Sequence, residues 1–148
     1  MNKEREPQLP RLTLEIVAQQ AQETTLEDGG HAPTLIIEGS NRSVVLQFKK
    51  IADTHEGRAA QMTSAGFTMA QESVTGIPKQ VFLISEGWLS SAKDGQLPDT
   101  SPSQDPNRIE VLIVTGVDLT AREYKGVIFE MKRDDEGQLM ALEAHQPP

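Results

Sequence analysis

Apolar residues recur at helical spacing near the start of the chain, and polar residues fill the positions between them. The residues on this apolar side are Leu12, Ile16, Val17 and Ala21. Pro10 suits a first helical turn, because the N–H that it lacks would have no partner there. The pattern therefore predicts a helix from Pro10 to Leu26, ended by Gly29-Gly30.

Six further segments are rich in apolar and β-branched residues and predict strands. These segments are residues 34–38, 43–48, 80–89, 108–117, 125–133 and 138–144. A second helix is predicted from Thr54 to Ala65, because Asp53 provides an acidic N-cap and Glu56 follows it three residues later. Gly66 is expected to end this helix.

The resulting order, α-β-β-α-β-β-β-β, indicates an α+β fold, because strands follow one another in runs that helices seldom interrupt. We expect a single domain with a largely antiparallel sheet of five to six strands and two helices mainly on one face. The domain is expected to cover residues 9–144, with flexible tails at 1–8 and 145–148. The polar segment 90–107 contains three prolines, and such a long loop is expected to be either disordered or a lid.

The third and fourth predicted strands are apolar on both faces, which is typical of strands in the middle of a sheet. Two helices on one face would leave the other face open, and soluble proteins rarely expose so large an apolar surface. The residues of this second face are Phe82, Ile84, Leu112, Val114 and Ile128. We expect a second copy of the protein to cover it. The alternatives are the long loop or closure of the sheet into a partial barrel.

Charged residues and the single tryptophan lie at one end of these strands. An antiparallel register that sets Phe82 opposite Leu112 also brings an arginine between two glutamates beside the tryptophan. The residues of this candidate pocket are Glu86, Trp88, Arg108 and Glu110. In a structural interpretation, Arg108 only neutralises half-buried carboxylates at the rim of the sheet. In a functional interpretation, one glutamate stays incompletely paired and acts as a general acid or base.

Composition narrows the classes of function. The 148 residues include no cysteine, which excludes disulfides and thiolate metal sites. Fourteen Lys and Arg against 22 Asp and Glu give a formal net charge of −8, and no basic cluster is present, so binding to nucleic acid or to an anionic membrane is not expected. The charged N-terminus and the lack of an apolar run of about 18 residues predict a soluble, cytoplasmic protein.

Sequence motifs of nucleotide, dinucleotide and serine-hydrolase sites are absent. His31, His55 and His145 have no spacing that would bring two imidazoles to one metal, so no metal or other cofactor is expected. His31 lies directly before the first predicted strand and is added to the candidate pocket.

These patterns favour a non-catalytic binding or interaction module that forms a homodimer or part of a larger assembly. The alternative is a small enzyme or small-molecule binder, whose pocket near Trp88, Glu86 and Arg108 would be capped by the 90–107 loop.

Overall fold

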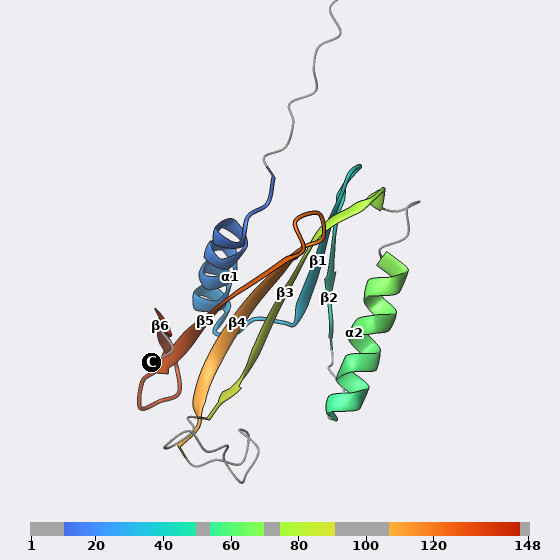
Figure 1. The fold of residues 1–148 in the computed structure, drawn as a ribbon. Coiled ribbons are helices and arrows are strands. Elements are labelled where there is room, and N and C mark those ends of the chain that lie inside the picture. The colour runs from blue at the N-terminus through green and yellow to red at the C-terminus, as the bar shows by residue number, and fades with distance from the viewer. Residues whose placement is uncertain (1–10, 50–53, 70–74, 91–106, 146–148) are drawn as a thin grey trace, which may run out of the picture.

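The computed structural model describes residues 11–49, 54–69, 75–90 and 107–145, which form a six-stranded antiparallel sheet and two helices (Figure 1). The helices are α1 (Leu14–Asp28) and α2 (His55–Met69). The strands are β1 (Thr34–Gly39), β2 (Ser43–Gln47), β3 (Pro78–Leu89), β4 (Ile109–Asp118), β5 (Glu123–Arg133) and β6 (Leu139–Ala144). The predicted α+β class and element order are confirmed, and the strands lie in the spatial order β2-β1-β3-β4-β5-β6.

α1 begins later than predicted. The side chain of Thr13 accepts a hydrogen bond from the backbone N–H of Ile16 at 3.2 Å, so Thr13 is the N-cap and the first helical residue is Leu14. The predicted start at Pro10 lies outside the described residues. The predicted end is close to the observed one, since Gly29 closes the helix in the left-handed conformation with φ 78°.

α2 continues past Gly66, so the prediction that this glycine ends the helix is wrong. Gly66 is not among the residues with positive φ, and a Cβ added there would contact nothing within 4 Å. Met62 and Ala65 pack against the sheet. This packing offsets the poor intrinsic helix propensity of a glycine inside the helix.

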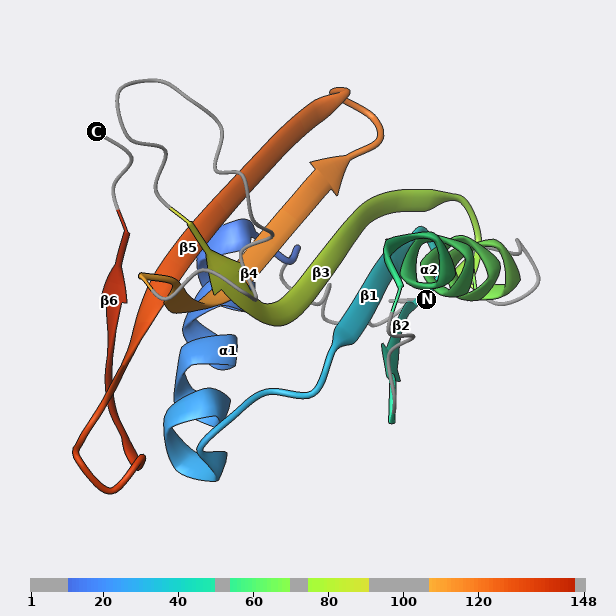
Figure 2. The same ribbon diagram turned by 90° about the horizontal axis from the view of Figure 1, so that it is seen from below.

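The two helices lie on opposite faces of the sheet, whereas the sequence analysis placed both mainly on one face. On β3, Phe82 and Ile84 belong to a core cluster with residues of α1, while Val81 and Leu83 pack in a second cluster with residues of α2. Adjacent residues of a strand point to opposite faces, so these two clusters are separated by the sheet. In Figure 2, α1 lies below the central strands and α2 above β1 and β2.

The connection between β2 and β3 explains the position of α2. Both strands pair antiparallel with β1, so they run parallel to each other on either side of it. A helix that joins two parallel strands of one sheet follows a right-handed crossover, and this rule selects the face on which α2 lies. α1 precedes the first strand, so the rule does not apply to it.

α1 covers the apolar sheet face that we expected a second copy of the protein to cover. It packs against β3, β4, β5 and β6, and the cluster beneath it buries Phe82, Ile84, Leu112 and Val114. Ile128, the fifth residue of the expected surface, points to the opposite face and is half-buried. The burial of the first four residues therefore requires no partner.

The register of β3 and β4 also differs from the prediction. Phe82 pairs with Gly116 rather than with Leu112, and Leu112 pairs with Glu86. Because the offset is four residues, an even number, every side chain of β3 and β4 stays on the face predicted for it. Gly116 leaves room for the ring of Phe82, since a Cβ there would lie 3.0 Å from Phe82 Cδ1.

Several predictions concern residues outside the described ranges. These are the expected tail at 1–8, most of the expected tail at 145–148, and the loop between residues 90 and 107, of which the structure describes only the two ends. Neither described helix is long and apolar enough to cross a membrane.

Candidate functional site

The charged residues of the predicted pocket contact partners that the strand pattern did not indicate. Arg133 donates two hydrogen bonds to the carboxylate of Glu110, at 2.8 Å from Nε and 2.7 Å from Nη2. The bond to Glu110 raises the pKa of the Arg133 guanidinium. Arg108 places its guanidinium carbon 4.3 Å from the centroid of the Trp88 ring, in a cation–π contact. Glu110 is thus bonded to Arg133, which the sequence analysis had not considered.

Glu86 and His31 come together, but through the backbone of the histidine. The N–H of His31 donates to Glu86 Oε1 at 2.7 Å, and Nδ1 of the ring lies 2.6 Å from the carbonyl oxygen of Ala32. Gly30 permits this approach, because a Cβ at that position would lie 3.0 Å from the same carboxylate oxygen. Glu86 therefore holds the segment that leads from α1 into β1.

Most of the predicted pocket residues lie away from the best-defined cavities of the described residues. The two best-defined cavities among the described residues are not lined by Glu86, Trp88, Arg108 or Glu110. Trp88 is 42% exposed. Of the predicted set, His31 lines one of these two cavities.

That cavity, of about 210 Å³, is a groove between α1 and the strands β1 and β2. α1 packs mainly on β3 to β6 and reaches β1 at Ile36, so Val45 of the edge strand β2 remains largely exposed. We call this hollow the α1–β2 groove. Its lining residues are Leu12, Ile16, Val17, Gln20, Ala21, Thr24, His31, Thr34, Ile36, Gln47 and Ile84.

The α1–β2 groove contains no Asp, Glu, Lys or Arg. Its apolar surface continues onto the edge strand, where Val45 pairs with Ile36 and points to the same face. Val45 is 59% exposed and Ile16, on the facing side of α1, is 42% exposed. An uncharged, partly apolar surface therefore runs from α1 to the edge of the sheet.

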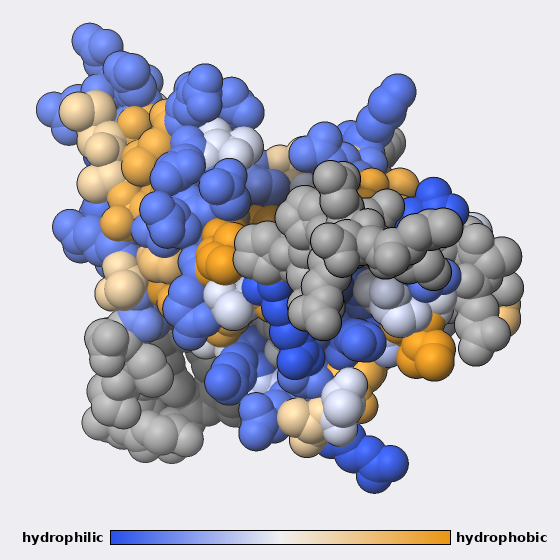
Figure 3. Space-filling view, turned by 90° about the horizontal axis from the view of Figure 1, so that it is seen from above, coloured by the Kyte–Doolittle hydropathy of each residue, from blue (hydrophilic) through white to orange (hydrophobic). Residues whose placement is uncertain are grey.

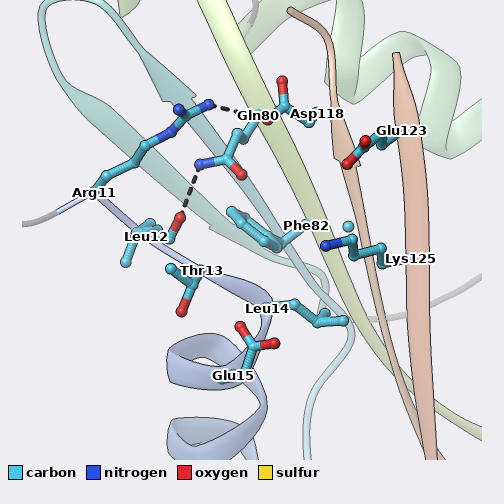
Figure 4. A pocket seen from close by; sticks show the side chains of 11 residues that line it. Arg11, Leu12, Thr13, Leu14, Glu15, Gln80, Phe82, Asp118, Glu123 and Lys125 are labelled. Carbon is cyan, nitrogen blue, oxygen red and sulfur yellow. Dashed lines mark hydrogen bonds and ion pairs between the residues drawn. The ribbon is translucent and has the colours of Figure 1, made fainter. Parts of the chain in front are cut away.

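A second cavity, of about 250 Å³, lies at the start of α1, where the chain enters the helix (Figure 4). We call it the corner cavity. Its lining residues are Arg11, Leu12, Thr13, Leu14, Glu15, Gln80, Phe82, Gly116, Asp118, Glu123 and Lys125.

A hydrogen-bond network holds residues 11 and 12 against the sheet beside this cavity. Gln80 Nε2 donates to the carbonyl oxygen of Leu12 at 2.8 Å and to Glu38 Oε1 at 3.2 Å. The N–H of Leu12 donates to the second oxygen of Glu38 at 2.9 Å. Arg11 pairs with Asp118 at 3.1 Å and lies 3.8 Å from Glu38. The chain thus enters α1 in a defined position.

Asp118 also closes the turn between β4 and β5. Its Oδ1 accepts the backbone N–H groups of Thr120 at 2.9 Å and Ala121 at 3.0 Å. The hydrogen bond from Ala121 contributes most to lowering the pKa of Asp118, and the charges of Arg11 and Lys125 act in the same direction. Asp118 therefore stays ionised beside the cavity.

The sequence analysis missed the residues of the corner cavity, although one signal was present. Glu38, Gln80 and Asp118 are polar residues on the apolar face of their strands, close to the strand ends. A polar residue in such a position needs a partner when it is buried. The strand pattern alone does not reveal that residues 11 and 12 supply it.

A further apolar surface follows the edge strand β6. Met140 is 62% exposed, and Ala141 and Leu142 are half-buried. Figure 3, which looks onto the end of the molecule where α1 begins, shows apolar residues along the side that holds β6 and mostly hydrophilic residues elsewhere. Both edges of the sheet therefore expose apolar side chains.

Among the residues that the structure describes, no group of three or more His, Asp and Glu could hold a metal ion. Comparison with known protein families, curated proteins and solved structures finds no significant similarity to this chain.

Proposed function

We propose that the protein is a non-catalytic assembly module that forms a homodimer through the edge strand β2. The observation that carries this proposal is Val45, an aliphatic side chain 59% exposed in the middle of an uncharged edge strand. The first reason for expecting a dimer, a bare central sheet face, no longer applies, because α1 covers the residues concerned.

β2 lacks most of the devices that keep edge strands from pairing. The sequence Ser43-Val44-Val45-Leu46-Gln47 contains no charged residue and no proline, and no bulge interrupts its pairing with β1. At the other edge, β6 carries Glu143, and its pairing with β5 is broken by an irregularity at Lys132 and Arg133. β2 is therefore the better edge for pairing with a second chain.

An antiparallel β2–β2 contact would also extend the α1–β2 groove. A two-fold axis beside Val45 brings the Val45 side chains of both copies together on the part of this sheet face that α1 leaves exposed. The two grooves then join across the axis, and Ile16 of each copy borders the shared apolar surface.

The distribution of charged residues also favours contact through β2 and the adjoining groove. Two chains that each carry a net charge of −8 repel each other, and contact is favoured where charged groups are fewest. Neither β2 nor the lining of the α1–β2 groove contains a charged side chain other than that of His31 when protonated.

The contacts at the predicted pocket support a non-catalytic role. Glu110 is held by Arg133, Glu86 by the backbone of His31, and Arg108 lies over Trp88. Each of these groups has a structural partner that explains its position, which favours the structural interpretation of the pocket.

The experiment compares two substitutions at matched positions. Val45→Glu and Met140→Glu each add a charge at an exposed aliphatic residue, one on each edge strand, where the original side chains are 59% and 62% exposed. Sedimentation velocity at micromolar concentration should give twice the 16.3 kDa chain mass for the unmodified protein and for Met140→Glu, and the chain mass for Val45→Glu.

A single-chain mass for the unmodified protein at these concentrations would refute the homodimer. Dissociation by Met140→Glu but not by Val45→Glu would move the interface to β6. Unchanged far-UV circular dichroism of both variants would establish that the mass difference does not reflect unfolding.

A second candidate function, small-molecule binding, is favoured by the corner cavity. The sequence analysis placed such a pocket near Trp88, Glu86 and Arg108. The corner cavity instead lies between α1 and the opposite end of the central strands.

A further inference from the structure

The corner cavity is built on a regular grid of residues from three strands. In the register of the sheet, Gln80 pairs with Asp118, and Asp118 pairs with Glu123. The next row on the same face consists of Phe82, Gly116 and Lys125. Residues 11–15 form the wall opposite this grid. The result is a hollow with an apolar floor and a charged rim.

Gly116 creates the floor. It is buried at the centre of the second row, and a Cβ there would lie 3.0 Å from two atoms of the Phe82 ring and 3.8 Å from Leu14 Cδ1. Without that Cβ, the Phe82 ring can lie across the position of Gly116. An apolar group of a ligand would contact Leu14 and, over a small area, the Phe82 ring, which is only 2% exposed.

The charges at the rim are only partly neutralised within the chain. Arg11 and Asp118 pair with each other, and Asp118 is further held by two backbone N–H groups. No ion pair joins Lys125, Glu123 or Glu15 to another described residue. In Figure 4, the amino group of Lys125 and the carboxylate of Glu123 are both directed from β5 toward the cavity.

We propose that the corner cavity binds a small zwitterion of the amino-acid type. Its carboxylate would pair with Lys125, its ammonium group with Glu123 or Glu15, and its uncharged side chain would rest on Phe82 and Leu14. This proposal concerns a single copy of the chain and does not depend on the proposed dimer.

The mixed charges of the cavity disfavour ligands that carry only one charge. Among the described residues that line the cavity, an anion would meet the cations Lys125 and Arg11, of which Arg11 already pairs with Asp118, in a protein of net charge −8. A cation would be attracted by two carboxylates but would meet the Lys125 ammonium directed at the same space. A zwitterion pairs with the Lys125 ammonium and with a carboxylate at the same time. Small-molecule pockets typically combine apolar surface with a few such convergent polar groups.

The size of the cavity limits the side chain. An apolar cavity of about 150 Å³ holds a benzene molecule. By that scale, a cavity of about 250 Å³ holds a ligand of roughly ten non-hydrogen atoms, the size of valine, leucine or methionine.

The test uses NMR titration of the ¹⁵N-labelled full chain. Valine, leucine and methionine are compared with two analogues that each lack one charge, leucinamide and 4-methylpentanoate, and with inorganic phosphate. At least one of the three amino acids should shift the Gly116 and Lys125 amides with a Kd of about 1 mM or lower. The two analogues and phosphate should bind about two- to fivefold more weakly, since each lacks one exposed ion pair.

Two variants test whether the charges of Lys125 and Glu123 contribute to amino-acid binding. Lys125→Met keeps the aliphatic stem and removes the charge, and Glu123→Gln keeps the shape of the side chain. Each should raise the Kd about two- to fivefold. Lys132→Met is the matched control, because Lys132 is an exposed lysine of the same strand that does not line the cavity and pairs with Glu130. It should leave the Kd unchanged.

Three outcomes would overturn the proposal. The first is no shift at Gly116 with any of the amino acids at about 10 mM, ten times the expected Kd. The second is binding of 4-methylpentanoate, phosphate or leucinamide as tight as that of the amino acids, which would indicate a site for a single charge. The third is an equal effect of Lys125→Met and Lys132→Met. None of these outcomes depends on the oligomeric state.

Discussion

Two neighbouring residues of β4 provide the sharpest test of how the helices cover the sheet. Leu112 and Ile113 are both aliphatic and adjacent in the chain, but they point to opposite faces. Leu112 is 0% exposed in the cluster beneath α1, whereas Ile113 retains partial exposure on the other face. Truncation to alanine should therefore affect them unequally.

The expected magnitudes follow from burial. Leu112→Ala removes a fully enclosed side chain and leaves a cavity, which costs about 3–5 kcal/mol. Ile113→Ala removes a side chain that already contacts water and leaves no closed cavity, so we expect a loss of roughly 1–2 kcal/mol. At about 2–4 °C per kcal/mol for a chain of this size, Leu112→Ala should lower the Tm by about 6–20 °C and Ile113→Ala by about 2–8 °C.

The assay is urea unfolding followed by circular dichroism, with thermal unfolding as a second measure. Ile128→Ala serves as the control, since Ile128 pairs with Ile113 and is also half-buried. It should behave like Ile113→Ala. Equal losses for the Leu112 and Ile113 variants would refute the reasoning, because they would show that the second face of β4 is enclosed as completely as the first.

Three further predictions concern single contacts. The pKa of Asp118 is lowered from its ordinary value of 3.8, so its stabilising effect is present above that pH and is lost as the pH falls through the lowered folded-state value. Asp118→Asn should therefore reduce the urea midpoint at pH 7, and the difference from the unmodified protein should shrink below pH 3.8; a difference independent of pH would contradict this assignment. Gly39→Ala should destabilise the fold by about 2 kcal/mol or more in urea unfolding, because a Cβ there would overlap the backbone carbonyl oxygen of Thr75; full stability would show that this backbone can move. Glu110→Gln removes a two-bond ion pair to Arg133, whose partners are 22% and 30% exposed, and should cost about 0.5–1 kcal/mol with a smaller effect at high salt; a salt-independent loss would mean that packing rather than charge is involved.

The strands were predictable because their pattern is local. Side chains of a strand alternate between two faces, so a half-buried strand such as β3 shows a two-residue period in its own sequence. The end of α1 and the turn before β6 also depend on local sequence. Gly29 closes α1 with φ 78°, and Asp134 accepts the N–H groups of Glu136 and Gln138 in the turn before β6. Such features depend on a few neighbouring residues.

The candidate pocket was harder to predict because it depends on register. The loop from β3 to β4 is long and does not set how the two strands align. A shift of four residues places Trp88 opposite Glu110, and the ion pair of Glu110 comes from Arg133 on the far side of β4. No spacing within residues 80–117 contains that information.

The periodicity of each helix or strand, the face to which its side chains point and the order of the elements are properties of short segments. The spacing of apolar residues along the chain indicates them directly. Helix placement, strand alignment and cavities arise from contacts between segments far apart in sequence. α2 takes its face from the crossover between two parallel strands, and α1 takes the other face. The corner cavity exists only because residues 11–15 reach β3, β4 and β5 at the level of Gly116. Long-range packing selects among arrangements that share the same local pattern, and it therefore selects the surfaces on which function depends.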